Sequence, residues 1–367
     1  MQPYSTQFLQ EDDFLEVITA LKNPLLTQGN ITLEFEKALS KFCNAKYALV
    51  FNSATSALYA AYNALNLENS EVITTPLSFV ATTNMLLQNH ATPIFCDIKQ
   101  DGNINPEKII PLITKKTKAI VSVDYGGKSV DIDSIKAICK EYNLSFISDS
   151  SHAIGSEYKN QKVGGLADAT IFSFHPVKPM TTLEGGALLT NSKAIYEKAK
   201  LVRSHGVIKK NLWHYDVICN GFNFRMNEVQ AALGISQLKK LPHFIQVREN
   251  IAKFYDSFFA NNPYFTTIHQ NNPYISSNHL YTILLNPTLQ PKKEKVFQLF
   301  QENGLGVQVH YKPIYHFSYY KNLFGNISLP QTEAFYNATL SIPCHHKLEL
   351  HQAEKIAQKI LYLFSKI

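Results

Sequence analysis

The stretch IFSFHPVKPMTTLEGGALLT, residues Ile171–Thr190, decides the fold that this sequence predicts. It contains two short apolar runs joined by a turn, and the turn holds Lys178. Short apolar runs bounded by turn residues are typical of buried strands. Upstream, the apolar run SFISD (residues Ser145–Asp149) ends in Asp149. We therefore predict a buried sheet that carries a lysine and an aspartate at the ends of its strands.

This pairing of a lysine with an aspartate suits a Schiff-base enzyme. A lysine must lose its proton before it attacks a carbonyl carbon, and burial lowers its pKa. An ionised aspartate can hold a protonated pyridine ring nitrogen. Pyridoxal phosphate (PLP) chemistry uses both groups, with Lys178 and Asp149 in these roles. The alternatives are a lysine in a surface loop and an aspartate that caps a helix.

The neighbours of Lys178 favour the functional interpretation. Ser173 and His175 precede the lysine, and the pair Gly185-Gly186 follows it. Paired glycines allow a close approach of backbone segments, because they carry no Cβ atom. Each feature alone is weak evidence, but together and in this order they indicate a functional site.

Short apolar runs alternate with helical patterns along the first part of the chain. The runs lie at residues 47–51, 72–75, 93–98, 119–125 and 145–150. This alternation predicts parallel βαβ units covered by helices on both faces, so the fold class is α/β with a mostly parallel sheet.

The pattern changes from about Met226. Two consecutive helices, interrupted near Pro242, are expected first. A strand YTILL, a helix KEKVFQLFQENG, strands VQVHY and TLSIP, and a final helix follow. We expect a large α/β domain over residues 1–240 and a small α+β domain over residues 241–367.

Composition excludes several classes of protein. The 367 residues are 45% hydrophobic and 17% charged, with a net charge of +6, which is an ordinary globular balance. No apolar run is long enough to cross a bilayer, and no signal-peptide pattern opens the chain, so we expect a soluble cytoplasmic protein. Nucleic-acid motifs are absent, and five scattered cysteines predict reduced thiols.

Two groups of charged or metal-binding side chains remain. The basic segment RSHGVIKK (Arg203–Lys210) is either solvated surface or a surface that faces an anionic substrate. The histidines His345, His346 and His351 lack the spacing of a known metal site, so we expect no bound metal.

Small and aromatic residues complete the predicted site. The turn Asn52–Ala57 lies between a strand and a helix, and its hydroxyls and free N–H groups suit a phosphate, although an ordinary helix cap is the alternative. Phe79 either stacks on a cofactor ring or fills a core. His152 either binds a cofactor hydroxyl or points into solvent.

The chain closely resembles a known family in the order of six segments, NSATSAL, TPLSFVAT, SDSSHAIGS, FSFHPVKPMTTLEGGALLTN, RSHG and GFNFRMNEVQAALG. These are typical of the sugar aminotransferases of the DegT/DnrJ/EryC1/StrS family. The resemblance covers essentially the whole chain and implies the PLP-dependent fold type I of aspartate aminotransferase. Some relatives replace the lysine with histidine and become dehydratases, whereas this chain keeps the lysine.

The resemblance also implies roles for individual residues. Lys178 would form the Schiff base and move the proton, Asp149 would hold the ring nitrogen, and His152 would lie by the ring hydroxyl. The other implied cofactor contacts are Phe79 on the ring face, Thr55, Ser56 and Ser173 on the phosphate, and Asn223 from the partner subunit of a homodimer. Implied sugar contacts are Gly29, His310, Tyr311 and Tyr315, although VQVHY is equally typical of a plain strand.

The implied reaction transfers an amino group from L-glutamate to C4 of a UDP-linked 4-keto-6-deoxy sugar. SVDYGGKSVDID, SFHPVKPMTT, LVRSHGVIKK, VQVHYKPIY and LSIPCH resemble the branch that acts in pseudaminic acid biosynthesis, whose product is attached to flagellin. Two alternatives remain, namely a 4-aminotransferase of the perosamine or legionaminic type and a PLP-binding regulator on the same fold. The regulator would need a DNA-binding appendage.

Overall fold

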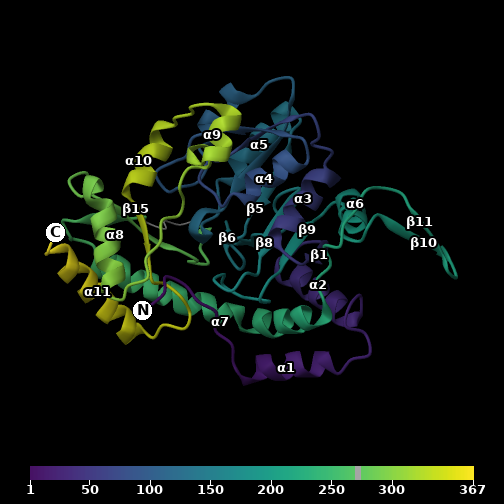
Figure 1. Cartoon of the computed structure of the whole chain (residues 1–367), viewed down its shortest axis with the longest axis horizontal. Coiled ribbons are helices and arrows are strands. Elements are labelled where there is room, and N and C mark those ends of the chain that lie inside the picture. Colours follow the sequence, from purple (N-terminus) through teal and green to yellow (C-terminus); the bar gives the residue numbers. More distant parts are fainter. Residues whose placement is uncertain (269–273) are drawn as a thin grey trace.

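The computed structural model describes residues 1–268 and 274–367. A seven-stranded sheet lies at the centre of the molecule, in the order β1-β9-β8-β5-β4-β2-β3 (Figure 1). Its strands are β1 (Tyr47–Phe51), β2 (Glu71–Thr74), β3 (Thr92–Phe95), β4 (Thr117–Val123), β5 (Ser145–Asp149), β8 (Ala169–Ser173) and β9 (Gly186–Thr190). Strands β8, β5, β4, β2 and β3 run parallel to one another, whereas β9 runs antiparallel to β1 and β8. The predicted α/β fold with a mostly parallel sheet is confirmed.

Helices cover both faces of this sheet. They are α2 (Asn30–Phe42), α3 (Ala54–Ala64), α4 (Ala81–Gln88), α5 (Ile132–Tyr142), α6 (Lys193–Arg203) and α7 (Glu228–Phe258). In β1, Leu49 and Phe51 pack in one apolar cluster with residues of α3 and α6, and Ala48 and Val50 pack in another with residues of α2 and α7. Because both faces are buried, the strands read as continuous apolar runs instead of alternating ones.

Helix α7 continues through Pro242 without a break, so the expectation of two helices interrupted there is wrong. An interior proline costs a helix about 3 kcal/mol, because it removes one backbone N–H donor. Leu241 and Phe244 on either side are buried, and α7 packs along α1 (Glu11–Leu21) and α2. Figure 1 shows α1 lying beside α7 at the edge of the molecule. This burial offsets the cost of the proline.

The boundary expected after residue 240 falls inside α7. The helix belongs to the packing of both parts of the chain, since Leu238 lies in a cluster with the large sheet and Tyr255 lies in the C-terminal core. The division into two domains at this residue stays a prediction.

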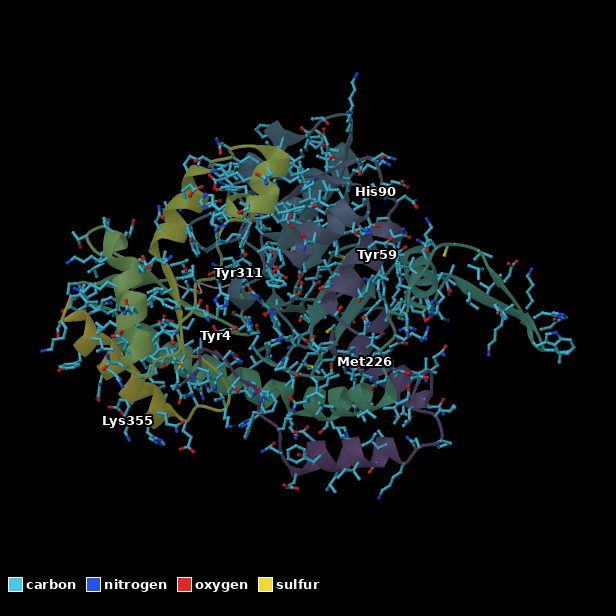
Figure 2. All side chains as sticks on the ribbon, in the orientation of Figure 1. Tyr4, Tyr59, His90, Met226, Tyr311 and Lys355 are labelled. Atoms are coloured by element: carbon cyan, nitrogen blue, oxygen red, sulfur yellow. The ribbon has the colours of Figure 1, made fainter. Side chains whose placement is uncertain are left out.

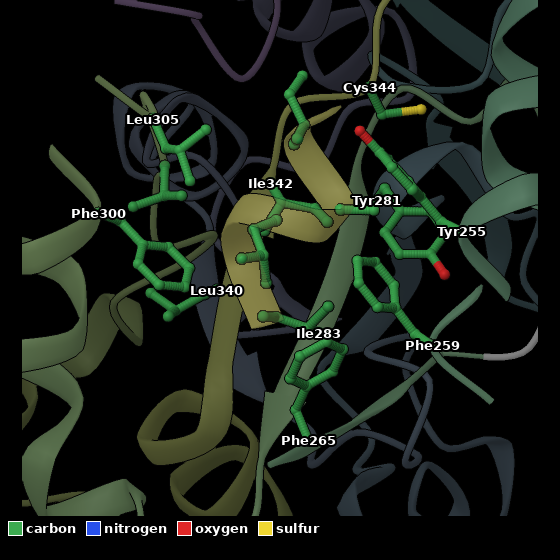
Figure 3. Close-up of a cluster of buried hydrophobic side chains, with 14 of the residues drawn as sticks. Tyr255, Phe259, Phe265, Tyr281, Ile283, Phe300, Leu305, Leu340, Ile342 and Cys344 are labelled. Carbon is green, nitrogen blue, oxygen red and sulfur yellow. The ribbon is translucent and has the colours of Figure 1, made fainter. Parts of the chain in front are cut away.

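The C-terminal part forms its own apolar core around a small antiparallel sheet. The sheet contains β12 (Phe265–Thr267), β14 (Tyr281–Leu285) and β15 (Thr339–Ile342), and helices α8 (Lys293–Glu302), α9 (Ser318–Phe324), α10 (Pro330–Ala338) and α11 (Leu350–Phe364) accompany it. Figure 3 shows Ile283 and Ile342 at the centre of this core, between Phe300 and Phe259. The predicted strands YTILL and TLSIP, the helix KEKVFQLFQENG and the final helix are confirmed.

The predicted strand VQVHY does not form. Within residues 307–311, only Gln308 pairs with a strand residue, in an isolated bridge to Ser341 of β15. The ring of His310 is held by a hydrogen bond between its Nδ1 and Ser341 Oγ, and the Tyr311 hydroxyl lies 2.9 Å from His152, in the turn that follows β5. These contacts with two different parts of the fold hold the segment in an irregular path.

Smaller elements lie at the periphery. Strands β6 (Glu157–Tyr158), β7 (Gln161–Lys162) and β13 (Tyr274–Ile275) form a third sheet. Strands β10 (Val207–Asn211) and β11 (His214–Val217) form a hairpin that extends away from the body of the molecule (Figure 1). The basic segment RSHGVIKK thus leads into this hairpin. In the described part of the chain, no helix is both long enough and apolar enough to cross a membrane.

Candidate active site

A cavity of about 830 Å³ opens at the carboxyl ends of the parallel strands. The ends of β4, β5 and β8 contribute Val123, Asp149 and Ser173, and the first turn of α3 contributes Thr55. Open α/β sheets bind ligands at this edge, because loops there leave a crevice between neighbouring crossovers. The segment after Gln308 closes the cavity from the C-terminal part of the chain.

Asp149 lies at the floor of the cavity and is 5% exposed. Its carboxylate accepts hydrogen bonds from the hydroxyl of Thr82 at 2.6 Å and from the hydroxyl and the backbone N–H of Ser151 at 2.5 and 3.2 Å. Within residues 1–268 and 274–367, no cationic side chain lies within ion-pair distance of this carboxylate. A buried carboxylate is costly without a cation, so Asp149 is a strong candidate to bind a positively charged ligand atom.

Lys178 follows β8 in the turn that the sequence singled out. Its backbone N–H donates to the carbonyl of His175, which begins a tight turn after the strand. Burial lowers the pKa of the Lys178 amine from 10.5 to about 8, although the negative charge of Asp149 opposes this effect. An appreciable fraction of the amine is therefore unprotonated near neutral pH, as a nucleophile requires.

A corner suited to a phosphate lies at the start of α3. Ser53 caps this helix by accepting a hydrogen bond from the N–H of Ser56, and Thr55 lines the cavity beside it. Gly186 at the start of β9 passes directly behind this turn, because a Cβ atom there would lie 2.4 Å from the backbone nitrogen of Ala54. The glycine that the sequence singled out is thus required for the close approach of β9 to the helix N-terminus.

His152 is uncharged and lies between two partners. Burial, together with the nearby charges of Lys178 and His310, holds the pKa of His152 well below its usual range. The backbone N–H of Gly126 donates to His152 Nδ1, so the ring proton resides on Nε2, which lies 2.9 Å from the Tyr311 hydroxyl. With its oxygen engaged as an acceptor, Tyr311 can direct its own O–H toward the cavity.

The structure brings together most of the residues that the sequence selected. The predicted residues that line the cavity are Thr55, Phe79, Asp149, His152, Ser173, Lys178, His310 and Tyr311. Phe79 is 62% exposed, as expected for a ring that faces an open space instead of a core. The roles of these residues stay predictions, but their convergence from distant parts of the chain supports them.

Four predicted residues do not line this cavity. The Ser56 hydroxyl bonds to Asn52 and Ser53. Gly29, which precedes α2, donates its backbone N–H to the buried carboxylate of Glu228 in the first turn of α7. The other two are Tyr315 and Asn223.

The Tyr315 hydroxyl donates to Glu333 of α10 at 2.8 Å, and Asn223 is exposed beside the turn at Asn52. Asn223 was expected to serve the site of a partner subunit, so its absence from the cavity of its own chain does not test that role. The sugar-binding roles of Gly29 and Tyr315 also stay predictions.

Sequence reasoning missed other lining residues, among them Tyr4, Thr82, His279 and Lys312. Thr82 lies within the quoted segment TPLSFVAT and Lys312 within VQVHYKPIY, so these two polar side chains were detectable signals. Tyr4 and His279 lie far from every motif in the sequence, and only the folded chain places them here.

In the part of the chain that the structure describes, no group of three or more His, Cys, Asp or Glu side chains could hold a metal ion. His345 and His346 instead surround the buried guanidinium of Arg248, which donates to His346 Nδ1 at 3.3 Å. Burial lowers the pKa of His345 to about 3, so this histidine is uncharged beside the arginine.

The lining residues fit PLP. Lys178 makes no side-chain hydrogen bond to the residues that the structure describes, and the Asp149 carboxylate lacks a cation. The start of α3 offers N–H groups and the hydroxyl of Thr55 to a phosphate. An amine, an anion and a phosphate corner around one cavity match the aldehyde, the ring nitrogen and the phosphate of this cofactor.

Comparison with known proteins agrees with this geometry. The model of the DegT/DnrJ/EryC1/StrS aminotransferase family matches residues 7–361. The chain is similar to the UDP-4-amino-4,6-dideoxy-N-acetyl-beta-L-altrosamine transaminase of Helicobacter pylori, with 50% identity over 98% of this chain and 97% of the relative. It is also similar to the transaminase of the same description from Campylobacter jejuni, with 48% identity over 100% of this chain and 98% of the relative.

Solved structures are similar over the same length. PseC of Helicobacter pylori, an aminotransferase involved in the biosynthesis of pseudoaminic acid, superposes with a TM-score of 0.97 at 49% identity, over 99% of both chains. A sugar aminotransferase of Streptococcus pneumoniae in its PLP form superposes with a TM-score of 0.94 at 29% identity, over 99% of this chain and 98% of the other.

Proposed function

The chain belongs to the DegT/DnrJ/EryC1/StrS aminotransferase family, and from this premise we propose its substrates. The enzyme is an aminotransferase that uses pyridoxal phosphate. The amino group passes from L-glutamate to C4 of a UDP-2-acetamido-2,6-dideoxy-hexos-4-ulose. The product is UDP-4-amino-4,6-dideoxy-N-acetyl-β-L-altrosamine, a precursor of pseudaminic acid that is destined for flagellin. The similarity to the Helicobacter and Campylobacter transaminases supports this choice of sugar.

Different residues of the cavity would bind different parts of the cofactor. Lys178 would hold its aldehyde carbon covalently, Asp149 its ring nitrogen, and Phe79 one face of its ring. Thr55 and Ser173 would hold the phosphate at the start of α3. The third predicted contact, Ser56, would have to turn its hydroxyl away from Asn52 and Ser53 to join them. When bound, pyridoxal phosphate supplies an electron sink for the negative charge that develops on the substrate carbon.

Lys178 carries the proton in the proposed reaction. With a pKa of about 8, its amine can take a proton from the α-carbon of glutamate and release it again near neutral pH. The hydroxyls of Thr82 and Ser151 donate to the Asp149 carboxylate and hold it in place at the floor of the site. A negative carboxylate at the floor of the site keeps the ring nitrogen protonated, so one side chain moves the proton while the other fixes the charge.

The same groups would act in the second half-reaction, in which the proton transfers run in the opposite direction and the sugar receives the amino group. Lys178 returns a proton to C4, while the uncharged pair His152 and Tyr311 offers an O–H donor without adding a positive charge. An uncharged donor suits the hydroxyl and keto oxygens of a hexose. Lys312 at the edge of the cavity is exposed and is the proposed contact for the diphosphate.

A homodimer with the site at the subunit interface is the proposed assembly. The hairpin of β10 and β11 extends from the body of the subunit, and its Trp213 is 75% exposed. Large apolar side chains on a projecting hairpin favour burial against a second copy. Asn223, exposed beside the start of α3, would then complete the phosphate corner of the partner subunit. The proposed compartment is the cytoplasm, which suits the five free cysteines.

The observation that carries the proposal is the amine of Lys178 beside the carboxylate of Asp149 in one cavity. Its test is the visible absorption spectrum of purified protein before and after addition of L-glutamate, followed by the 4-keto sugar. We expect a cofactor band that glutamate bleaches and that the 4-keto sugar restores, with formation of the 4-amino product. Lys178→Ala should lose both responses, whereas Lys355→Ala, an exposed lysine on α11 (Figure 2), should keep them.

A panel of nucleotide-linked 4-keto sugars separates the sugar specificities. Faster transfer to a perosamine-type or legionaminic-type acceptor would reject the proposed substrate while leaving the aminotransferase chemistry intact. A protein that stays colourless after incubation with PLP would contradict the assignment of Lys178.

A further inference from the structure

The peptide unit that joins Val177 to Lys178 is held by a hydrogen bond on each side. Its N–H, which belongs to Lys178, donates to the carbonyl of His175 at 2.9 Å. Its carbonyl, which belongs to Val177, accepts from the hydroxyl of Ser5 at 2.7 Å. Because a peptide unit is planar, these two hydrogen bonds together fix its orientation and the position of the Lys178 Cα atom.

Local backbone contacts give this turn little support. Pro176 and Pro179 flank the peptide unit, and neither has a backbone N–H to donate. The N–H of Val177 lies 3.4 Å from His175 Nδ1, which is a long hydrogen bond. Among residues 1–268 and 274–367, the only donor to the Val177 carbonyl is the hydroxyl of Ser5. The turn that carries the lysine therefore depends on a side chain 172 positions upstream in the sequence.

Arg248 determines the direction of the Ser5 hydroxyl. Its guanidinium donates to the Ser5 oxygen at 3.2 Å. Because a guanidinium has no acceptor atom, the hydroxyl proton of Ser5 must point to another group, and the Val177 carbonyl lies within reach. Ser5 is 4% exposed and Arg248 is fully buried, so water does not compete for either hydrogen bond. The chain of bonds thus runs in one direction, from Arg248 through Ser5 to Val177.

Contacts with the C-terminal part of the chain hold Ser5 and Arg248 in place. The carbonyl of Tyr4, next to Ser5, accepts from the N–H of Cys344 at 3.1 Å. The guanidinium of Arg248 donates to the carbonyls of Cys344 and Asn278 at 2.6 and 3.1 Å. Cys344 belongs to the C-terminal core (Figure 3). Since both Ser5 and Arg248 are fixed at Cys344, the hydroxyl of Ser5 is a rigid support for the turn.

We propose that Ser5 is a positioning residue for Lys178, which it orients by holding the Val177 carbonyl. An amine that attacks a carbon and then moves a proton must be held close to the reacting atoms, and small displacements cost rate. Ser5 acts through the backbone and contacts no substrate in this role. The inference rests on the proposed function of Lys178 and deepens it. Because Lys178 serves both half-reactions, Ser5 should affect both alike, unlike a residue that contacts only one substrate.

Ser5→Ala tests the inference in the apoprotein, because it removes only the hydroxyl. The first readout is amide hydrogen exchange, measured by mass spectrometry on peptides that cover residues 174–183. Exchange in this turn should be about tenfold faster, since the peptide unit loses one of its two hydrogen bonds. The second readout is the rate at which the apoprotein captures PLP. This rate should fall about tenfold with an unchanged pH midpoint, because Lys178 stays buried near Asp149.

Single turnovers of the holoenzyme give a third readout. The rate constants with glutamate and with the 4-keto sugar should fall by about the same factor, while the concentrations needed for half-maximal rate stay unchanged. A single-turnover rate constant does not depend on the fraction of active molecules, so partial unfolding cannot produce this result. Ser70→Ala is the matched control. The Ser70 hydroxyl is buried, donates to the carbonyl of Leu67 and lies outside the cavity, so this variant should behave as wild type in all three readouts.

Three results would overturn the role of Ser5. They are a capture rate equal to that of the wild type, a defect confined to one half-reaction, and an equal loss of rate in Ser70→Ala, which would mean that any buried serine hydroxyl serves as well. Failure of the proposed function gives a different result, in which Lys178→Ala captures PLP covalently as fast as the wild type. In that case the inference falls too, although the faster hydrogen exchange in Ser5→Ala would remain.

Discussion

The rate at which apoprotein captures PLP should depend on pH through the ionisation of Lys178. Only the unprotonated amine attacks the aldehyde, and burial lowers its pKa from 10.5 to about 8. At pH 7 the unprotonated fraction is therefore about one in ten, against about one in 3000 for an ordinary lysine. The expected gain in capture rate over an exposed lysine is about 300-fold at this pH.

Asp149→Asn gives this prediction a sign that can be checked. The carboxylate of Asp149 stabilises the protonated amine and so raises the pKa of Lys178 against the effect of burial. Without this charge the pKa should fall below about 8, and the midpoint of the capture rate should move to lower pH. The same variant should lose transamination, because the cofactor ring nitrogen loses its anionic partner.

The assay is stopped-flow absorbance of PLP mixed with apoprotein between pH 6 and pH 10, on the scale of about two pH values on either side of the expected midpoint. Lys312→Gln is the matched control, since Lys312 lines the same cavity but is exposed, and the midpoint should not move. A wild-type midpoint near 10.5, or a midpoint that rises in Asp149→Asn, would refute the reasoning.

Three further predictions follow from contacts around the site. Arg248→Met should lower the free energy of unfolding by about 3–5 kcal/mol, because the carbonyls of Asn278, His279 and Cys344 lose a buried donor; an unchanged midpoint in chemical denaturation would contradict this. Gly186→Ala should cost about 1–3 kcal/mol and weaken PLP binding, because its Cβ would press on the backbone at Ala54; calorimetric unfolding and PLP titration measure the two effects. Lys312→Ala should weaken binding of UDP about fivefold at low salt, and a salt-independent affinity in the wild type would exclude a charge contact.

The buried surroundings of Arg248 explain why the first of these effects should be large. The guanidinium is fully buried and has no carboxylate partner among the described residues, so its charge is balanced by carbonyl dipoles, Ser5 and neutral histidines. Burial lowers the pKa of Arg248 to about 10, which leaves the side chain charged at neutral pH. Because the N-terminal segment, α7 and the turn at Cys344 all meet there, one substitution loosens three parts of the chain.

Local patterns were sufficient to predict the strands of the central sheet. The runs at β1, β4 and β5 are apolar throughout, and this pattern requires helices on both faces of a parallel sheet. The same reasoning found Lys178, Asp149 and Gly186, because each occupies a strand end or turn whose chemistry depends on immediate neighbours.

The failures have a common physical cause. Pro242 lies inside α7 because burial of Leu241 and Phe244 outweighs the lost hydrogen bond, and no local pattern reports that burial. VQVHY does not form a strand because His310 and Tyr311 bond to Ser341 and His152, which are distant in sequence. Tertiary contacts of this kind override local propensity.

The sequence by itself was enough to predict the α/β class, the family and the roles proposed for the lysine and the aspartate, since these predictions depend on periodicity and on short motifs that are each read from one segment. Only the tertiary structure decided which side chains share the cavity. It brought Tyr4, Thr82 and His279 into the cavity that Lys178 lines and directed the hydroxyl of Tyr315 to Glu333. A side chain's neighbours across the fold depend on the packing of whole helices and sheets, and that packing is not written in any single segment.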